Sequence, residues 1–569
     1  MTIESERVNG DAGETGTSDA DRNRLHDMGY AQELNRRMGW FSNFAISFSI
    51  ISILAGAMTT YWLGMQAGGP RAIMLSWIIV GFFALLVGMA MAEICSTYPT
   101  AGGLYYWSAK LARRNGPRWS WYTGWFNLLG LIGVIASVDF ALATFTGFFI
   151  QLYRPGFEIS GSSGARNIFI IFVIYLAVHG LLNTFRVDLV ALLGDISVWW
   201  HVVGVLVIFA VLFIAPAHHQ SVHFLTEGKN LTGWSGPFAG IYVFGLGLLL
   251  AQYTITGFDA SAHVSEETHS AHTEAPKAIV RAIYVSAIAA FVLNLAMTLA
   301  IPKGNFDAST PMYNHIAFTG INAAPELIRI AVGGAGAKLL ILISIVGQFF
   351  CGMASVTAAS RMIYAFSRDG AVPGHRVWHR INPKTRTPTN SVWLAVVLSA
   401  IVGASSLYQN KGVSIAFFAM TGICVVGLYI AYIIPVFLRL RNPNFVQGEW
   451  NLGRYSQVVG WAAVVWVIFV SLYFFAPVYP VLGFLRAHQY RDFANNFNWS
   501  GPLILLSFIA VTIWWFTSAK NWFNGPIVQG SKDELMAIER ALDSGDVQTF
   551  EQIERVEEER LEETLGHDH

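Results

Sequence analysis

The chain has 569 residues, of which 54% are hydrophobic and only 13% charged, and its 36 basic side chains balance 36 acidic ones. A soluble domain carries about 25% charged residues, so this composition excludes an assembly of soluble domains. Aromatic residues make up 14% of the chain and its 53 glycines follow no period, which excludes disordered, collagen-like and coiled-coil proteins. The composition therefore predicts an all-α polytopic membrane protein.

Apolar runs long enough to cross a membrane recur about twelve times, since a spanning helix needs about 20 such residues. The predicted spans cover residues 41–66, 71–95, 120–152, 167–185, 188–215, 236–262, 279–301, 335–366, 390–408, 413–438, 456–480 and 501–518. The preceding residues 1–38 are polar and acidic, so we expect no cleavable signal peptide. The three cysteines, Cys95, Cys351 and Cys424, fall inside apolar runs and are predicted to be buried, without disulfides or metal.

Charge along the chain predicts the orientation and the tails. The densest basic loop, residues 368–386, belongs inside by the positive-inside rule, which makes both termini cytoplasmic in a plasma (inner) membrane protein. Residues 1–38 and 521–569 are then cytoplasmic tails, and the second is expected to form an acidic amphipathic helix. Because the tails are acidic and the body is basic, they are expected to fold back onto the basic loops. The apolar positions of that helix are Leu535, Ile538, Leu542, Ile553, Val556 and Leu561.

Two of the predicted spans contain polar stretches at mid-membrane. Residues 42–56 of the first span and 252–261 of the sixth combine hydroxyl side chains with a glycine, five spans apart. Broken helices in corresponding positions mark the binding site of transporters built from inverted repeats. We therefore predict, within a transmembrane domain 39–520, one repeat over about 41–215 and another over about 236–438. Extra helices follow over about 456–518.

Three short motifs strengthen this prediction. They are Ala92-Glu93-Ile94-Cys95-Ser96-Thr97-Tyr98-Pro99-Thr100-Ala101-Gly102-Gly103-Leu104-Tyr105-Tyr106-Trp107, Thr256-Gly257-Phe258-Asp259 with Glu266-Glu267-Thr268, and Ser367-Arg368-Asp369-Gly370-Ala371-Val372-Pro373. Together they resemble the amino acid-polyamine-organocation transporters, in particular fungal GABA and choline permeases and bacterial amino acid permeases. The resemblance covers about residues 30–520. It implies a leucine-transporter-type fold of five plus five inverted helices, with discontinuous helices 1 and 6.

The resemblance also implies a substrate site at the two breaks. Free amides at Ser52, Ile53 and Leu54 would face a carboxylate, and the half-helix dipole would assist them. An amino group would meet carbonyl groups, and an aromatic ring at Tyr253 or Phe258 would close over the ligand. The carbonyl groups belong to residues near Ile50, Ile51, Tyr253 and Thr256, and further candidate contacts are Thr254, Gly257, Asn127 and Ser355. The alternatives are hydroxyls that bond their own helices and, for Asn127, a bond between helices.

His201 occupies the middle of the fifth span, where several bacterial relatives carry a lysine that contacts the unwound first span. An imidazole with an ordinary pKa of about 6.5 can change its charge during a transport cycle. We therefore consider His201 a candidate for proton coupling. The alternative is a neutral, structural histidine bonded to a backbone carbonyl.

These predictions converge on a secondary transporter that is not an enzyme. It would import a small amino acid or related amine by alternating access, coupled to protons, within membrane lipid. Choline, polyamine or GABA transport stays open, with Tyr253, Phe258, Trp125 and Phe126 as candidates for an aromatic cage around a quaternary ammonium group. A transporter-like solute sensor that signals through its tail is the alternative from another class. No cofactor, metal or nucleic acid is predicted.

Overall fold

The computed structural model describes residues 19–185, 187–407, 415–482 and 487–544, together with 548–549, 552–553 and 556. The outer parts of both predicted tails, including Leu561, lie outside the described residues. So do residues 408–414, where the tenth span was predicted to begin. Within the described ranges the chain is almost entirely helical.

Eleven helices in the described part of the chain are long and apolar enough to cross a membrane. The first is the interrupted helix Trp40–Thr59. The others are α5 (Gly69–Thr97), α7 (Gly116–Gln151), α8 (Gly161–Phe185), α9 (Val187–Ile214), α13 (Ala271–Leu299), α16 (Gly334–Arg368), α18 (Thr389–Gly403, continued as a 3-10 turn), α19 (Ile415–Leu440), α20 (Ser456–Phe475) and α23 (Ser500–Thr517). They confirm the predicted all-helical membrane fold.

The sixth predicted span is not among these eleven because it is divided into short helices, as the polar stretch predicted. They are α10 (Ala239–Gly247), α11 (Leu249–Thr254) and α12 (Ala260–His263). The first span is divided in the same way into α2 (Trp40–Ile51), α3 (Gly56–Thr59) and α4 (Tyr61–Gln66). Residues 52–55 and 255–259 are therefore non-helical and buried at the centre of the bundle, and we call them the first and the second break.

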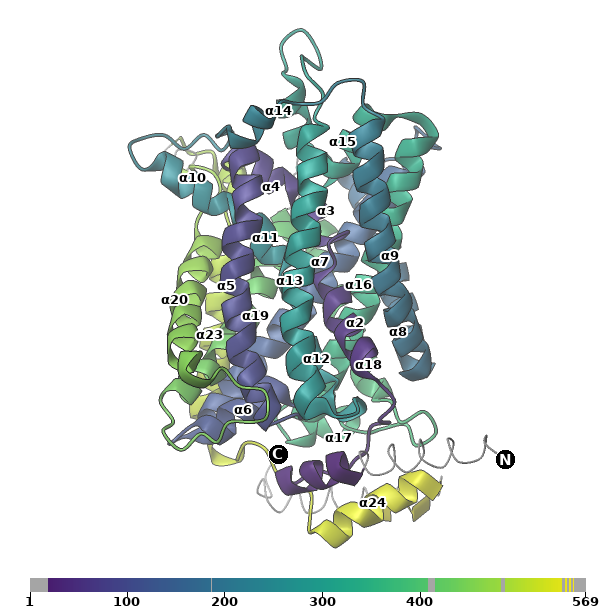
Figure 1. The fold of residues 1–569 in the computed structure, drawn as a ribbon, viewed down its shortest axis with the longest axis vertical. Helices are drawn as coiled ribbons and strands as arrows, with labels where there is room; N and C mark the ends of the chain where they lie inside the picture. Colours follow the sequence, from purple (N-terminus) through teal and green to yellow (C-terminus); the bar gives the residue numbers. More distant parts are fainter. Residues whose placement is uncertain are drawn as a thin grey trace, which may run out of the picture.

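The long helix α7 forms the middle of the bundle and packs along α19 and α16 (Figure 1). Glycines permit this close approach. A side chain at Gly130 would lie 2.7 Å from the backbone nitrogen of Leu428 on α19, and one at Gly427 would lie 2.9 Å from the Cα atom of Gly130. Small residues at helix contacts let backbones come together where lipid gives no hydrophobic driving force. The scaffold beside the breaks is therefore tightly packed.

Both described terminal segments lie at one end of the bundle, which we call the terminus face (Figure 1). The short helix α6 (Gly103–Leu111) lies at this face too. The opposite end carries α14 (Met312–Ala317) and α15 (Ala323–Val332).

The C-terminal tail forms α24 (Lys532–Ser544), which packs against the N-terminal segment. Leu535, Ile538 and Leu542 are buried there with Ala31. Polar contacts surround this apolar contact: His26 Nε2 lies 2.7 Å from Glu539 Oε1, and the Gln32 N–H donates to the same carboxylate oxygen over 2.8 Å. The two tails, predicted to fold back on the loops, thus form one layer beneath the bundle.

A strap of N-terminal residues continues from this layer to α2. The N–H groups of Arg37 and Met38 donate to the Glu267 carbonyl over 3.0 and 2.8 Å, and the His269 N–H donates to the Met38 carbonyl over 3.0 Å. The strap therefore joins the start of α2 to the segment that follows α12.

Candidate functional site

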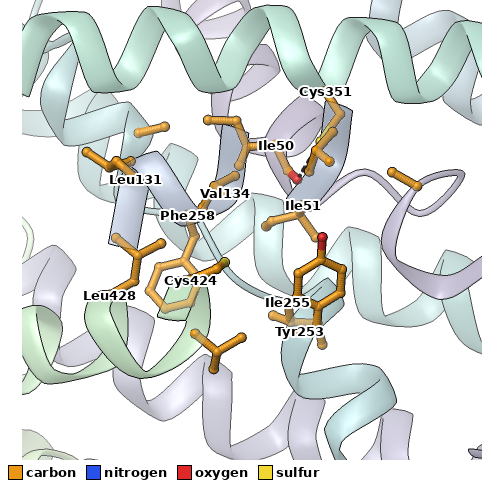
Figure 2. Close-up of a cluster of buried hydrophobic side chains, with 14 of the residues drawn as sticks. Ile50, Ile51, Leu131, Val134, Tyr253, Ile255, Phe258, Cys351, Cys424 and Leu428 are labelled. Carbon is orange, nitrogen blue, oxygen red and sulfur yellow. Dashed lines mark hydrogen bonds between the residues drawn. The ribbon is translucent and has the colours of Figure 1, made fainter. Parts of the chain in front are cut away.

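A small cavity lies between the two breaks. Its volume is about 20 Å³, which is room for roughly one water molecule. Its walls come from both broken spans and from α7, α16 and α19, and none of the lining residues is charged. They are Ile50, Ile51, Ala55, Gly56, Val134, Val138, Tyr253, Thr254, Thr256, Cys351 and Cys424. Figure 2 shows the phenol ring of Tyr253 among these apolar side chains.

The first break is held by side chains of α9 and α16. The Ser344 hydroxyl donates to the Leu54 carbonyl over 2.8 Å, and the Cys351 thiol donates to the Ile50 carbonyl over 3.1 Å, as drawn in Figure 2. His201 Nε2 lies 2.7 Å from the Ser52 hydroxyl oxygen. These contacts involve carbonyl groups and the Ser52 hydroxyl, and none of them involves a backbone N–H group of the break.

Three of the four backbone donors of the first break have no partner within the described residues, and the fourth, the Ala55 N–H, donates to the Ser52 carbonyl over 3.0 Å. No hydrogen bond there involves the N–H groups of Ser52, Ile53 or Leu54, although all three residues are buried. A buried N–H without a partner is costly and rare in a folded protein. These three groups thus mark a place where a carboxylate can be received.

The second break is held by two tyrosines of α19. The Tyr429 hydroxyl donates to the Ile255 carbonyl over 2.7 Å. The Tyr432 hydroxyl accepts the Gly257 N–H over 3.1 Å and donates to Asp259 Oδ1 over 2.6 Å. The ring of Phe258 packs on both phenols. Sequence reasoning missed these tyrosines, although their i, i+3 spacing would have placed them on one face of a helix.

Asp259 is the charged residue of the second break and is fully buried. Besides the Tyr432 hydroxyl, its carboxylate accepts the Asn127 amide over 3.1 Å and lies 3.2 Å from His263 Nε2. Asn127, proposed as a substrate contact, thus bonds a side chain from another helix. The sequence analysis included Asp259 only as a motif residue.

The structure distributes the predicted site residues over two zones. Five line the cavity: Ile50, Ile51, Tyr253, Thr254 and Thr256. Ser52, Ile53 and Leu54 form the first break beside it. The remaining ones, Asn127, His201, Gly257, Phe258 and Ser355, lie outside the lining, and the Ser355 hydroxyl donates to the Cys351 carbonyl of its own helix over 2.8 Å. The cavity adds residues that were not predicted, among them Val134, Val138 and Cys424.

His201 is buried against the first break. Its Nδ1 lies 2.8 Å from the Ser197 carbonyl one turn earlier, so this nitrogen carries a hydrogen and donates it. Nε2 faces the Ser52 hydroxyl, and in a neutral ring this nitrogen accepts the hydrogen of that hydroxyl. No carboxylate of the described residues pairs with His201. These contacts favour a role in positioning Ser52, and proton coupling through His201 stays a prediction.

Buried ion pairs close the terminus face below the breaks. Arg361 and Glu267 pair with nitrogen–oxygen distances of 2.7 and 3.1 Å, and Arg368 Nη2 lies 3.4 Å from Glu266 Oε1. The Ser47 hydroxyl of α2 donates to the Phe258 carbonyl over 2.9 Å. Together with the cavity of about 20 Å³, these contacts describe a closed state.

Asp369, just after α16, links this closure to the tails. Its carboxylate accepts the Tyr105 hydroxyl over 2.6 Å, the Tyr30 hydroxyl over 3.2 Å and the Ile527 N–H over 3.1 Å. Burial raises the pKa of Asp369 to about 6, while the Arg368 charge and these hydrogen bonds oppose the rise.

The chain is similar to known transporters over almost its whole length. It matches the model of a family described as "Amino acid permease" over residues 38–517. It is 39% identical to "Amino-acid permease BAT1" of Arabidopsis thaliana, over 91% of this chain and 99% of that protein. The BAT1 homolog of Oryza sativa subsp. japonica is 38% identical, over 91% and 97%. A "Putative polyamine transporter" of Candida albicans is 25% identical, over 93% of each chain.

Proposed function

Because the chain belongs to the amino acid permease family of multi-pass membrane transporters, we propose that it imports a small neutral amino acid together with a proton by alternating access. The observation that carries this proposal is the chemistry of the cavity. Its lining combines apolar side chains with backbone groups of two broken helices and contains no charged side chain. This chemistry suits a zwitterion, whose two charges can be met by backbone dipoles.

The unpartnered N–H groups of Ser52, Ile53 and Leu54 are the proposed site for the substrate carboxylate. Donors at a helix start combine hydrogen bonding with the positive end of the helix dipole. The carbonyl groups of Ile50, Ile51, Tyr253 and Thr256 are the proposed site for the amino group. This assignment keeps the two ends of the substrate on backbone groups and leaves its side chain to face α7, α16 and α19.

The lining of the cavity disfavours the other substrates that the sequence left open. A polyamine carries several positive charges, which need carboxylates, and none lines the cavity. A quaternary ammonium group needs several aromatic faces, and Tyr253 supplies the one ring in the lining. Trp125 and Phe126 pack instead on Trp514 and Phe508. Val134, Val138, Cys351 and Cys424 suit a small apolar side chain.

The cavity of about 20 Å³ is too small for an amino acid, so binding requires the walls to move apart. Alternating access through rocking of one helix group against a scaffold provides this movement. We propose that the terminus face is the cytoplasmic side of a plasma membrane. The basic residues that gather there, including Arg361, Arg368 and Arg439, support this orientation.

The proposal is tested with purified protein in two steps. Thermal-shift screening against neutral, basic and acidic amino acids, GABA, polyamines and choline, with and without sodium, identifies the ligand, because binding stabilises the folded state. Uptake of the hit into proteoliposomes then tests transport. We expect stabilisation by small neutral amino acids and uptake without sodium. A hit confined to polyamines or choline would contradict the substrate class, and saturable binding without any uptake would favour the sensor.

A further inference from the structure

Asp259, the last residue of the second break, and His263 form a buried pair. Both side chains are fully buried, and His263 Nε2 lies 3.2 Å from Asp259 Oδ2. The other ring nitrogen, Nδ1, lies 3.0 Å from the Ala101 carbonyl oxygen. The imidazole thus bridges the start of α12 to the stretch before α6. An ionisable pair at this depth indicates a functional site more often than a stabilising one.

The two nitrogens of His263 both face oxygen acceptors, and this fixes the number of protons in the pair. Nδ1 must carry a hydrogen, because a carbonyl can only accept. A hydrogen must also lie between Nε2 and Asp259 Oδ2, since otherwise a lone pair would face a carboxylate oxygen. In the closed state the pair therefore holds one proton more than a neutral histidine and an ionised aspartate would hold together. It sits on Nε2 or on Oδ2, and the pair is neutral overall.

We propose that the Asp259–His263 pair is the binding site of the proton that moves with the substrate. This inference rests on the proposed function. Loading forms one N–H or O–H bond, and release breaks that bond and returns the proton to water on the other side of the membrane. With the proton in place, His263 bonds both Asp259 and Ala101 and closes this part of the terminus face. Without the proton, the lone pair and the carboxylate repel each other, and the contact opens.

One hydroxyl group connects this pair to the substrate site. Tyr432 donates to Asp259 Oδ1 over 2.6 Å and accepts the N–H of Gly257, a residue of the second break, over 3.1 Å. A change of charge on Asp259 thus changes the acceptor strength of the phenol that holds the break. Hydrogen-bonded chains in a medium of low dielectric constant transmit such changes effectively. The Tyr432 hydroxyl thus links proton binding at the pair to the conformation of the second break.

The side chains of other helices that bond Asp259 are neutral, and one charged side chain, Glu266, is connected to His263 through Ala101, whose N–H donates to Glu266 Oε1 over 2.9 Å. From α19 the Tyr432 phenol bonds Asp259 over 2.6 Å, and the Tyr429 phenol and the Cys424 thiol are further titratable groups of that helix that interact with its charge. From α7 the neutral amide of Asn127 bonds it. From α2 the Ser47 hydroxyl bonds the adjacent Phe258 carbonyl. In the described chain neither member of the pair has an ion-pair partner other than the other member. The arginines of α16 that close this face pair with Glu266 and Glu267.

The structure supplies a matched control in a second pair of the same chemistry. Asp139 of α7 and His179 of α8 are also fully buried, with 3.1 Å between Oδ2 and Nδ1. The described hydrogen bonds of these two side chains reach neither break. A variant of Asp139 therefore removes the same kind of buried pair without touching the proposed proton site.

The experiment compares two assays in proteoliposomes with the amino acid found by screening. Counterflow exchanges labelled for unlabelled substrate and needs no net proton movement, whereas accumulation driven by a pH gradient does. For Asp259→Asn and His263→Gln we expect counterflow to persist and proton-driven accumulation to fall at least tenfold. Asp259→Glu should retain accumulation with a displaced pH profile. Asp139→Asn should keep the wild-type pH profile. Uptake by the wild type should lower the pH inside the vesicles, as reported by an enclosed pH-sensitive dye.

Several results would overturn the inference. One is accumulation at the wild-type level in both Asp259→Asn and His263→Gln. Another is loss of coupling in Asp139→Asn instead. If substitutions at the pair prevent folding, the dye measurement on the wild type decides, since uptake without proton entry contradicts the site. Absence of both counterflow and uptake in the wild type would instead be a failure of the proposed function.

Discussion

Residues 52–55 are held through carbonyl groups and the Ser52 hydroxyl, whereas residues 255–259 are held by two phenols of α19, one of which also bonds Asp259. The first break is held through its carbonyls and the Ser52 hydroxyl by α9 and α16, and the second through α19 and α7. In the proposed function the two breaks have separate tasks. The first binds the substrate carboxylate, and the second is connected through Asp259 to the proposed proton site.

The largest expected effect comes from the glycines where the two broken spans touch. Gly257 has φ +93°, and an added Cβ would lie 2.3 Å from the Ile50 side chain. Gly257→Ala adds left-handed strain of about 1–2 kcal/mol and overpacking of about 1–3 kcal/mol. We expect uptake below about 5% of the wild type. Gly236→Ala is the control, since Gly236 has φ +108° but nothing within 4 Å.

Gly56, which directly follows the first break, offers a second glycine to compare with Gly257. An added Cβ would lie 2.7–2.8 Å from Oγ1 and Cα of Thr254, but no positive φ is involved. Gly56→Ala should therefore reduce uptake less than Gly257→Ala. The reverse order would show that the first break tolerates less distortion than the second, contrary to the comparison.

Removal of the phenol hydroxyls is expected to have the next largest effect. Tyr432→Phe deletes one bond to a backbone N–H and one to a carboxylate, worth about 1.5–3 kcal/mol. We expect kcat/KM for uptake to fall about 10- to 100-fold. Tyr429→Phe, which deletes only the bond to the Ile255 carbonyl, should cost several-fold. Equal effects of both variants would argue that Asp259 adds nothing to the second break.

A smaller effect is expected from His201, which positions Ser52 in the first break. His201→Ala leaves the Ser52 hydroxyl without its partner at 2.7 Å, a loss of about 1 kcal/mol. We expect uptake reduced about three- to tenfold with an unchanged pH profile. A profile that becomes flat would instead assign proton coupling to His201 and contradict the separation of tasks between the breaks.

The smallest effect concerns stability at the terminus face, below both breaks. The pKa of Asp369 is raised to about 6, so the folded state binds an extra proton between about pH 4 and 6. The free energy of unfolding should fall as pH rises through this window, by about 2–3 kcal/mol, and level off above it. Melting curves of Asp369→Asn should lose this dependence, and those of the exposed Asp27→Asn should keep it. These melting curves assign the pH dependence of stability to Asp369, apart from the pH dependence of transport that is proposed for Asp259 and His263.

Much of the fold could be predicted from local patterns. Apolar runs place the spans, because a membrane imposes length and composition. Hydroxyl-rich, glycine-containing stretches place the breaks, because polar, flexible backbone is tolerated at that depth only beside a cavity. The spacing of five spans also predicts two inverted repeats, which stay a prediction. These signals lie within single segments of the sequence, which explains why they could be recognised there.

Partners across the bundle could not be predicted in the same way. Asp259 and His263 are four residues apart, but nothing local shows that Asn127 and Tyr432 converge on them. Cys351 and Ser344 are ordinary residues of an apolar helix until packing brings them to the first break. Such contacts depend on which helix faces meet, and no pattern within one span records this.

In the alternating access proposed above, the strap formed by residues 37 and 38 limits which segments can separate at the terminus face. Backbone bonds to Glu267 and His269 tie the start of α2 to the end of the sixth span. A motion that carries both together leaves these bonds intact and has to separate the pairs Arg361–Glu267 and Arg368–Glu266. In the proposed opening the two broken helices move together, and the arginines of α16 lie at the boundary between the moving and the stationary helices.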